Sequence, residues 1–186
     1  MAPRKIQPSR SRIRRIRYAV IGLGHIAQIA VLPAFRNARR NSDLVTIVSG
    51  DKAKRRVIAG QYELRRTYSY DEYDRLLTSG TIDAVYVALP NHLHRSYVER
   101  ALRAGIHVLC EKPLGLTATD CRAMVGIAGR TETQLMVAYR LHFDEANLRM
   151  VELIHSGRLG HIRIFHSLFT QQVRAGDTRL KADVGG

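Results

Sequence analysis

The sequence predicts an α/β fold, a doubly wound parallel sheet of the Rossmann type, and three observations support this prediction. Short apolar runs rich in β-branched residues alternate with helical patterns through about the first 140 residues, as the strands and crossover helices of a parallel sheet do. The first apolar run leads directly into a glycine-rich turn. No run reaches the roughly 18 apolar residues of a membrane span, so we expect no contact with a membrane.

The first strand is expected over residues 16–21 and the first helix over 25–38, where Pro33 should kink or split it. Further strands are expected over residues 44–49, 84–89, 107–110 and 134–138. Further helices are expected over residues 52–62, 69–77, 95–104 and 117–129. Tyr68 is placed on a short strand, and Ser69 is expected to cap the helix that follows it, with Glu72 completing a capping box.

The turn after the first strand has the pattern G-x-G-x-x-A, which predicts a site for the phosphates of a dinucleotide. Gly22 permits a tight turn, Gly24 lets the backbone approach a pyrophosphate, and Ala27 lets the helix pack close to the sheet. The helix N-terminus would face the anion. The residues predicted to bind the cofactor here are Gly22, Leu23, Gly24, His25, Ile26 and Ala27.

The end of the second strand supplies Ser49, Gly50 and Asp51, which we expect beside the cofactor because ligands bind at the carboxyl ends of such strands. An acid at this place usually holds a ribose 2′-OH and favours NAD. Basic residues crowd positions 52–56, and a basic group there would accept the 2′-phosphate of NADP. The alternative interpretation is a solvated basic helix start, and both NAD and NADP stay open as cofactors.

The next strand end supplies Pro90, Asn91 and His94. Asn91 would aim its amide at the cofactor. His94 would reach the ligand cleft, or it would serve only as a cap or surface residue near the start of a helix.

Lys112 follows a later strand and lies between Glu111 and Pro113, which restricts its geometry. Beside an oxidised nicotinamide ring the like charge would disfavour its ammonium form. That would suit proton exchange with a hydroxyl that undergoes hydride transfer. A structural Glu–Lys surface pair is the alternative. Arg140, after the last strand, would line the same cleft or pair with a neighbouring acid.

The net charge is +14, and the first 40 residues contain no acid. We expect residues 1–15 to form a disordered basic arm. A contact with a polyanion such as nucleic acid is a weaker alternative, and an export signal at Arg14–Arg15 is weaker still. The two cysteines, Cys110 and Cys121, have no metal-type spacing, so we expect reduced thiols in a cytoplasmic protein and no metal site.

Five segments together resemble the Gfo/Idh/MocA oxidoreductases, and glucose–fructose oxidoreductase among them: GLGHIA, SGD, the PN-x-x-H segment, CEKPLG and AYRLH. The resemblance runs from about Arg17 to Gly186. It implies an N-terminal Rossmann domain, a C-terminal α/β substrate domain, and hydride transfer between NAD or NADP and a sugar, polyol or related hydroxyl compound. It also implies that Lys112 is the proton-transfer residue and that Glu111 and Arg140 lie on cofactor-contacting or cleft-edge segments.

The end of the chain departs from that family, whose members carry a D-x-G-x-H-like segment after a Gly-rich stretch. The sequence ends at Gly185–Gly186, about where this segment should begin. We therefore expect a dinucleotide-binding domain over residues 16–140 and an incomplete substrate domain over 141–186, comprising an amphipathic helix over 144–156 and a long strand over 162–173. The complete sheet of that domain would offer a surface for a homo-oligomer.

Two functions follow from the sequence. The first is an NAD(P)-dependent oxidoreductase whose turnover is impaired because part of the substrate domain is missing. The alternative is a non-catalytic dinucleotide-binding module whose basic arm contacts a partner or polyanion.

Overall fold

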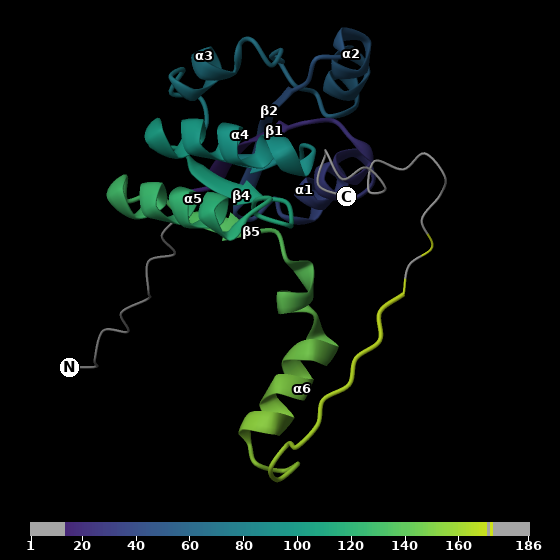
Figure 1. Cartoon of the computed structure of the whole chain (residues 1–186). Coiled ribbons are helices and arrows are strands. Elements are labelled where there is room, and N and C mark those ends of the chain that lie inside the picture. The colour runs from purple at the N-terminus through teal and green to yellow at the C-terminus, as the bar shows by residue number, and fades with distance from the viewer. Residues whose placement is uncertain (1–13, 171, 173–186) are drawn as a thin grey trace, which may run out of the picture. The chain divides into compact units, whose positions relative to one another are not determined.

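The structure of the protein is a computed structural model, and it describes residues 14–170 and 172. Most of the predicted arm, residues 1–13, and residues 171 and 173 of the last predicted strand lie outside the described residues. Strands and helices alternate along the chain (Figure 1) and include a five-stranded sheet with the order β2-β1-β3-β4-β5. This confirms the predicted α/β fold. The chain divides into two compact units, Met1–Tyr86 and Val87–Gly186, which are described in turn.

The first unit is built on two parallel strands, β1 (Ile16–Ile21) and β2 (Ser42–Val48). Their register shifts between Tyr18 and Ala19, where one extra residue of β2 is accommodated. The carboxyl-terminal halves of both strands are fully buried, in keeping with their apolar, β-branched sequences. These halves lead directly into two of the predicted cofactor-binding segments.

The helix after β1 is continuous from His25 to Asn37, but it changes its hydrogen-bonding pattern midway. A π-helical turn, η1 (Ala27–Val31), precedes α1 (Leu32–Asn37), and the Leu32 N–H donates to the Ala27 carbonyl, five residues earlier. Pro33 lies in the first turn of α1. A proline has no N–H to donate to the carbonyl four residues before it. The turn before Pro33 is a wider π-helical turn, and the helix continues without a break.

The rest of the first unit comprises α2 (Lys52–Gln61) and α3 (Tyr73–Leu77). Tyr68, which was expected on a short strand, forms only an isolated parallel bridge with Val48. The expected helix start at Ser69 is wrong, because Glu72 is the N-cap. The Glu72 carboxylate does accept the Ser69 N–H at 2.9 Å, which is one of the two hydrogen bonds of the predicted capping box. This bond stabilises the turn that precedes α3.

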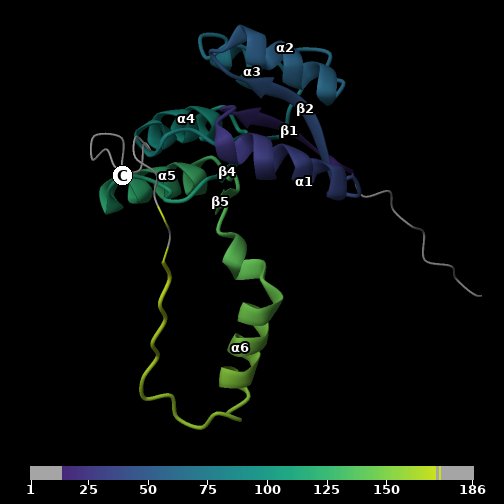
Figure 2. The ribbon, with the colours of Figure 1, turned by 90° about the vertical axis from the view of Figure 1, so that its right-hand side faces the viewer.

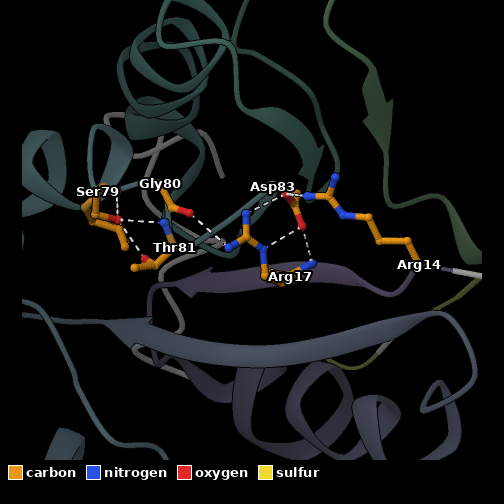
Figure 3. A network of polar contacts seen from close by, with 7 residues as sticks. Arg14, Arg17, Ser79, Gly80, Thr81 and Asp83 are labelled. Carbon is orange, nitrogen blue, oxygen red and sulfur yellow. Dashed lines mark hydrogen bonds and ion pairs between the residues drawn. The ribbon is translucent and has the colours of Figure 1, made fainter.

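A charged cluster fixes the start of β1, at the end opposite the glycine-rich turn (Figure 3). Asp83 accepts hydrogen bonds from the Arg17 backbone N–H at 2.9 Å, from Arg17 Nη2 at 2.8 Å and from Arg14 Nη2 at 2.8 Å. Arg17 Nη1 also donates to the Gly80 carbonyl at 2.9 Å. The hydrogen bond from the Arg17 side chain is the main cause that holds the pKa of Asp83 far below its usual range. The first basic residues of the described chain are thus structural.

The second unit continues the alternation with β3 (Ala84–Val87) at its boundary, then α4 (Asn91–Arg103), β4 (His107–Cys110), α5 (Ala118–Arg130) and β5 (Leu135–Val137). β4 and β5 pair parallel. Helix α4 begins four residues before the predicted start, because Pro90 is its N-cap and Asn91 its first residue. This change places His94 inside the first turn of the helix.

The end of the second unit holds the short 3₁₀ helix η2 (Arg140–Phe143) and α6 (Glu145–His155), which Asp144 caps by accepting the Asn147 N–H at 3.2 Å. The strand predicted over 162–173 is wrong for its described residues, which form neither helix nor strand (Figure 2). A strand depends on hydrogen bonds to a neighbour, and apolar alternation alone does not supply one.

Among the described residues, none of the helices combines the length and the apolar character that crossing a membrane requires.

Candidate functional site

The glycine-rich turn joins β1 to its helix and lies against the end of β2. The Gly22 N–H donates to the Val48 carbonyl at 2.9 Å, so the turn begins beside the residue that precedes Ser49. Leu23 is buried, and its carbonyl accepts from Gln28 Nε2 at 2.8 Å. Gly24, His25 and Ile26 are exposed. The structure therefore brings the predicted phosphate turn together with the predicted ribose segment of the first unit.

The two glycines of this turn meet different demands. Gly22 has a φ of 94°, a backbone conformation that L residues rarely adopt. Gly24 has no such φ, and a Cβ built on it would have no atom within 4 Å. Among the described residues, none occupies the space that a side chain at position 24 would fill. An open approach to backbone at the start of a helix fits the pyrophosphate of a dinucleotide.

Ala27 is fully buried and opens the π-helical turn. Its small side chain allows the helix to lie close to the core, as the motif predicts. The first N–H groups of a helix have no partner within the helix, and His25 and Ile26 occupy those exposed positions here. This arrangement supplies several N–H donors to an anion.

Residues in the first turns of α2 donate hydrogen bonds to the segment that follows β2. Asp51 is the N-cap of α2, and its Oδ1 accepts the Lys54 N–H at 2.9 Å. Arg55 Nη1 donates to the Ser49 carbonyl at 2.6 Å, while Arg55 Nε is buried and has no hydrogen-bond partner within the described part of the chain. Asp51 stays half exposed, at 51% of its side chain. One carboxylate oxygen thus serves the helix, and basic groups lie beside the segment predicted to select the cofactor.

The end of β3 leads into α4 through Pro90, the N-cap, and Asn91, which is half-buried. His94 is fully buried, and both of its ring nitrogens face backbone carbonyls. Nδ1 lies 2.8 Å from the Pro113 oxygen and Nε2 lies 2.9 Å from the Leu89 oxygen. The structure therefore unites His94 with the segment that carries Lys112, although the two are far apart in sequence.

The segment after β4 carries Lys112 on an exposed side chain. The Glu111 N–H donates to the Val87 carbonyl at 2.9 Å, which continues the β3–β4 pairing, and the Lys112 N–H approaches Glu111 Oε2 at 3.3 Å. The peptide bond between Lys112 and Pro113 is cis. The amine of Lys112 is thus available at the carboxyl end of β4, where the resemblance places the proton-transfer group.

The loop then packs tightly on α5 at Gly115, a contact that reasoning from the sequence missed. A Cβ on Gly115 would lie 3.0 Å from Asp120 Cβ and 3.1 Å from Met124 Cε. Thr117 and Asp120 form a reciprocal capping box at the start of α5, and Asp120 also accepts from Arg95 of α4 at 2.7 Å. The pattern T-x-x-D before an apolar run was the available signal for this anchor.

Arg140 is exposed and begins η2, directly after the end of β5. Cys110, the last residue of β4, is fully buried, and burial together with the Glu111 charge raises the pKa of its thiol to about 12. Neither cysteine forms a disulfide among the described residues. The described part of the chain also contains no group of three or more His, Cys, Asp or Glu side chains suited to a metal ion.

Comparison with known proteins identifies relatives with sugar-related activities. The chain is 34% identical over 175 residues, 94% of its length, to 50% of the dTDP-3,4-didehydro-2,6-dideoxy-alpha-D-glucose 3-reductase of Streptomyces violaceoruber. It is 32% identical over 159 residues, 85% of its length, to 44% of the NADP-dependent D-xylose 1-dehydrogenase of Haloarcula marismortui. The chain thus spans about half the length of the curated relatives it matches.

Solved structures show the same relationship. The aldose-aldose oxidoreductase of Caulobacter crescentus in complex with glycerol has a TM-score of 0.75 at 39% identity, over 79% of this chain and 44% of that one. A variant 3-ketoreductase of Actinomadura kijaniata in complex with TDP-benzene and NADP has a TM-score of 0.78 at 30% identity, over 93% of this chain and 52% of that one. The family model for Gfo/Idh/MocA proteins, described as an oxidoreductase family with an NAD-binding Rossmann fold, matches residues 16–139. The chain therefore belongs to the Gfo/Idh/MocA oxidoreductase family.

Proposed function

We propose that the protein is an NAD(P)-dependent oxidoreductase that moves hydride between the nicotinamide and a sugar, polyol or related hydroxyl compound. The observation that carries this proposal is the exposed Lys112, anchored at the end of β4 in a chain whose family has an NAD-binding Rossmann fold. Its relatives include a sugar-nucleotide reductase and a xylose dehydrogenase. The glycine-rich turn with its uncovered position 24 supports dinucleotide binding.

In this proposal each segment has one task. The N–H groups of residues 24–27 bind the pyrophosphate, and the segment of residues 49–51 contacts the adenosine ribose. Pro90, Asn91, Glu111 and Arg140 line the nicotinamide half of the cofactor. The bound nicotinamide supplies or accepts the hydride. The Lys112 amine exchanges the hydroxyl proton, because removing that proton makes the hydroxyl carbon a hydride donor.

Residues 16–140 are proposed as the dinucleotide-binding domain and residues 141–186 as the beginning of the substrate domain. A cytoplasmic location and self-association through the completed sheet of the second domain are further proposals. The free thiols of Cys110 and Cys121 are in keeping with the proposed cytoplasmic location.

The test separates cofactor binding from proton transfer. NADH and NADPH are titrated by nicotinamide fluorescence, and oxidation of aldoses and polyols is then followed with each cofactor. Lys112→Met should retain cofactor binding and lose about 100-fold or more of the rate of turnover. Lys112→Arg should be equally slow, because a guanidinium keeps the charge but does not release a proton. Absence of binding for both cofactors, or full turnover by Lys112→Met, would contradict the proposal.

A second function, a non-catalytic dinucleotide-binding module, is favoured by one observation, the net charge of +14 with no acid among the first 40 residues. A polyanion would then bind in a salt-dependent manner. Deleting residues 1–15 and measuring nucleic-acid binding at two salt concentrations tests this alternative. Binding that is unchanged by the deletion excludes the arm as the contact.

A further inference from the structure

We infer that His94 is a positioning residue that fixes the backbone beside Lys112 through its Nδ1 contact with the Pro113 carbonyl. The inference rests on the proposed function of Lys112. The sequence leaves two interpretations of His94, a ligand contact or only a cap or surface residue. In the structure the ring is fully buried and both nitrogens face carbonyl oxygens, those of Pro113 at 2.8 Å and Leu89 at 2.9 Å. Both polar atoms of the His94 side chain are therefore in contact with backbone atoms of the protein itself.

Lys112 lies between two such contacts. On one side the Glu111 N–H donates to the Val87 carbonyl at 2.9 Å, and on the other side the Pro113 oxygen lies 2.8 Å from His94 Nδ1. The first contact continues the sheet, and the second comes from the first turn of α4. The sheet alone therefore anchors the backbone only before Lys112, and His94 supplies the anchor after it.

This anchoring matters because the lysine side chain has four rotatable bonds and is exposed here. The fold limits the positions that the Lys112 amine can occupy by fixing the backbone to which the side chain is attached. Proton transfer requires that the amine lies within hydrogen-bond distance of the reacting hydroxyl, and small displacements of a reacting group lower rates strongly. A ring that holds the adjacent carbonyl acts on the reaction through Lys112 and needs no contact with cofactor or substrate.

The two nitrogens have separate partners, and this allows a matched pair of variants. In His94→Asn the amide nitrogen takes the place of Nδ1 and can still donate to the Pro113 carbonyl. In His94→Gln the amide nitrogen takes the place of Nε2 and can still donate to the Leu89 carbonyl. Each variant removes one contact and one ring, so general loss of packing should affect both to a similar degree.

Hydrogen exchange by mass spectrometry on the full chain tests the inference without requiring turnover. His94→Gln should speed amide exchange in the peptide spanning residues 111–116 by about tenfold or more, because the Pro113 carbonyl loses its contact with Nδ1 and the loop opens more often. His94→Asn should stay within about threefold of the unchanged protein. Melting temperatures of the two variants serve as the control for general destabilisation.

Where turnover is measurable, His94→Gln should lower kcat by about tenfold with little change in the KM for the cofactor, and His94→Asn should restore most of kcat. Equal exchange in the two variants, or faster exchange in His94→Asn, would overturn the inference. If cofactor binding or turnover is absent altogether, the proposed function fails, while the exchange result still decides whether His94 holds the loop.

If neither variant folds, the unchanged protein provides the measurement. A carbonyl accepts a hydrogen bond only from a protonated nitrogen, so the Pro113 contact requires a proton on Nδ1. Nitrogen-15 NMR of labelled histidines should show an exchange-protected Nδ1 proton for His94, assigned by comparison with the seven other histidines in the sequence. A ring with its proton on Nε2 alone would overturn the inference.

Discussion

At the scale of single residues, the two glycines of the phosphate turn should fail in different ways when they are replaced. Gly22→Ala should destabilise the protein by about 1–2 kcal/mol, because its φ of 94° strains any L residue. Gly24→Ala should leave stability unchanged, since a Cβ there meets nothing within 4 Å. The same Cβ would lie where a pyrophosphate approaches and should weaken NADH binding by about tenfold or more.

Thermal unfolding and fluorescence titration of the two variants check this prediction. Normal cofactor affinity in Gly24→Ala would show that position 24 does not face the phosphates. A loss of stability in that variant would contradict the open space around its Cβ. Each variant serves as the control for the other, because both add the same methyl group to the same turn.

Asp83 makes the stability of the folded protein depend on pH in the acidic range. Its pKa is lowered mainly by the Arg17 hydrogen bond, so its ionised form stabilises the folded state above its ordinary pKa of 3.8, and this contribution is lost as the pH falls below that value. Asp83→Asn should lower the free energy of unfolding by about 1–3 kcal/mol at neutral pH. It should also flatten the fall in stability in acid.

Urea unfolding between neutral and acidic pH measures this effect, with Asp43→Asn as the control. Asp43 pairs with Arg15 on the surface at 2.9 Å, and such pairs contribute little, about 0–1 kcal/mol. An acid profile of Asp83→Asn that matches that of the unchanged protein would contradict the assignment.

The sequence was sufficient to propose the site segments but not the partners of their side chains. The glycine pattern predicted where the helix begins, and the structure agrees at His25. Asp51 illustrates the limit, because a carboxylate after a strand can hold a ribose or cap the next helix, and here one of its oxygens caps α2. The contact of His94 with Pro113 was beyond prediction for another reason, since that carbonyl lies 19 residues away in the chain.

At the scale of elements, the contact between the Lys112 loop and α5 predicts opposite effects for two glycines. Gly115→Ala should destabilise the protein by about 1–3 kcal/mol, because its Cβ would press on Asp120 and Met124 at 3.0–3.1 Å. Gly129→Ala, near the end of α5, meets nothing within 4 Å and should stabilise the helix by up to about 1 kcal/mol. Differential scanning calorimetry of both variants checks the signs, and a neutral Gly115→Ala would mean that the loop yields.

The same scale shows why the fold was more predictable than its details. Short apolar runs predicted the five strands of the sheet. The β-branched content is highest in β1, β2 and β3, whose buried parts leave little choice of residue type. The start of α4 and the π-helical turn were missed, because both depend on how the chain satisfies hydrogen bonds around Pro90 and Pro33. The strand expected over 162–173 was missed because pairing requires a partner that periodicity does not reveal.

At the scale of the whole molecule, the described residues after α6 expose an unusual amount of apolar surface. Ile164 is 86% exposed and Phe169 is 83% exposed, with Phe165 and Leu168 nearby in sequence. Surfaces of this kind favour association. The isolated chain should therefore show an apparent mass that rises with concentration in light scattering.

A double variant, Phe165→Ser with Phe169→Ser, should reduce that association. The matched control is Ile29→Ser with Val57→Ser, which changes two similarly exposed apolar residues in the first unit. Equal association of both variants would place the contact elsewhere.

Cys110 offers a built-in reporter of motion in the sheet. Its thiol is fully buried with a pKa near 12, and its carbonyl accepts the Ala138 N–H at 2.7 Å beside β5. At neutral pH an alkylating reagent should modify the partly exposed Cys121 within minutes, and Cys110 only when β4 separates from its neighbours. The slow labelling rate then reports how often β4, the strand that leads into the Lys112 segment, opens. Bound cofactor should slow this labelling further, and more strongly the tighter it binds.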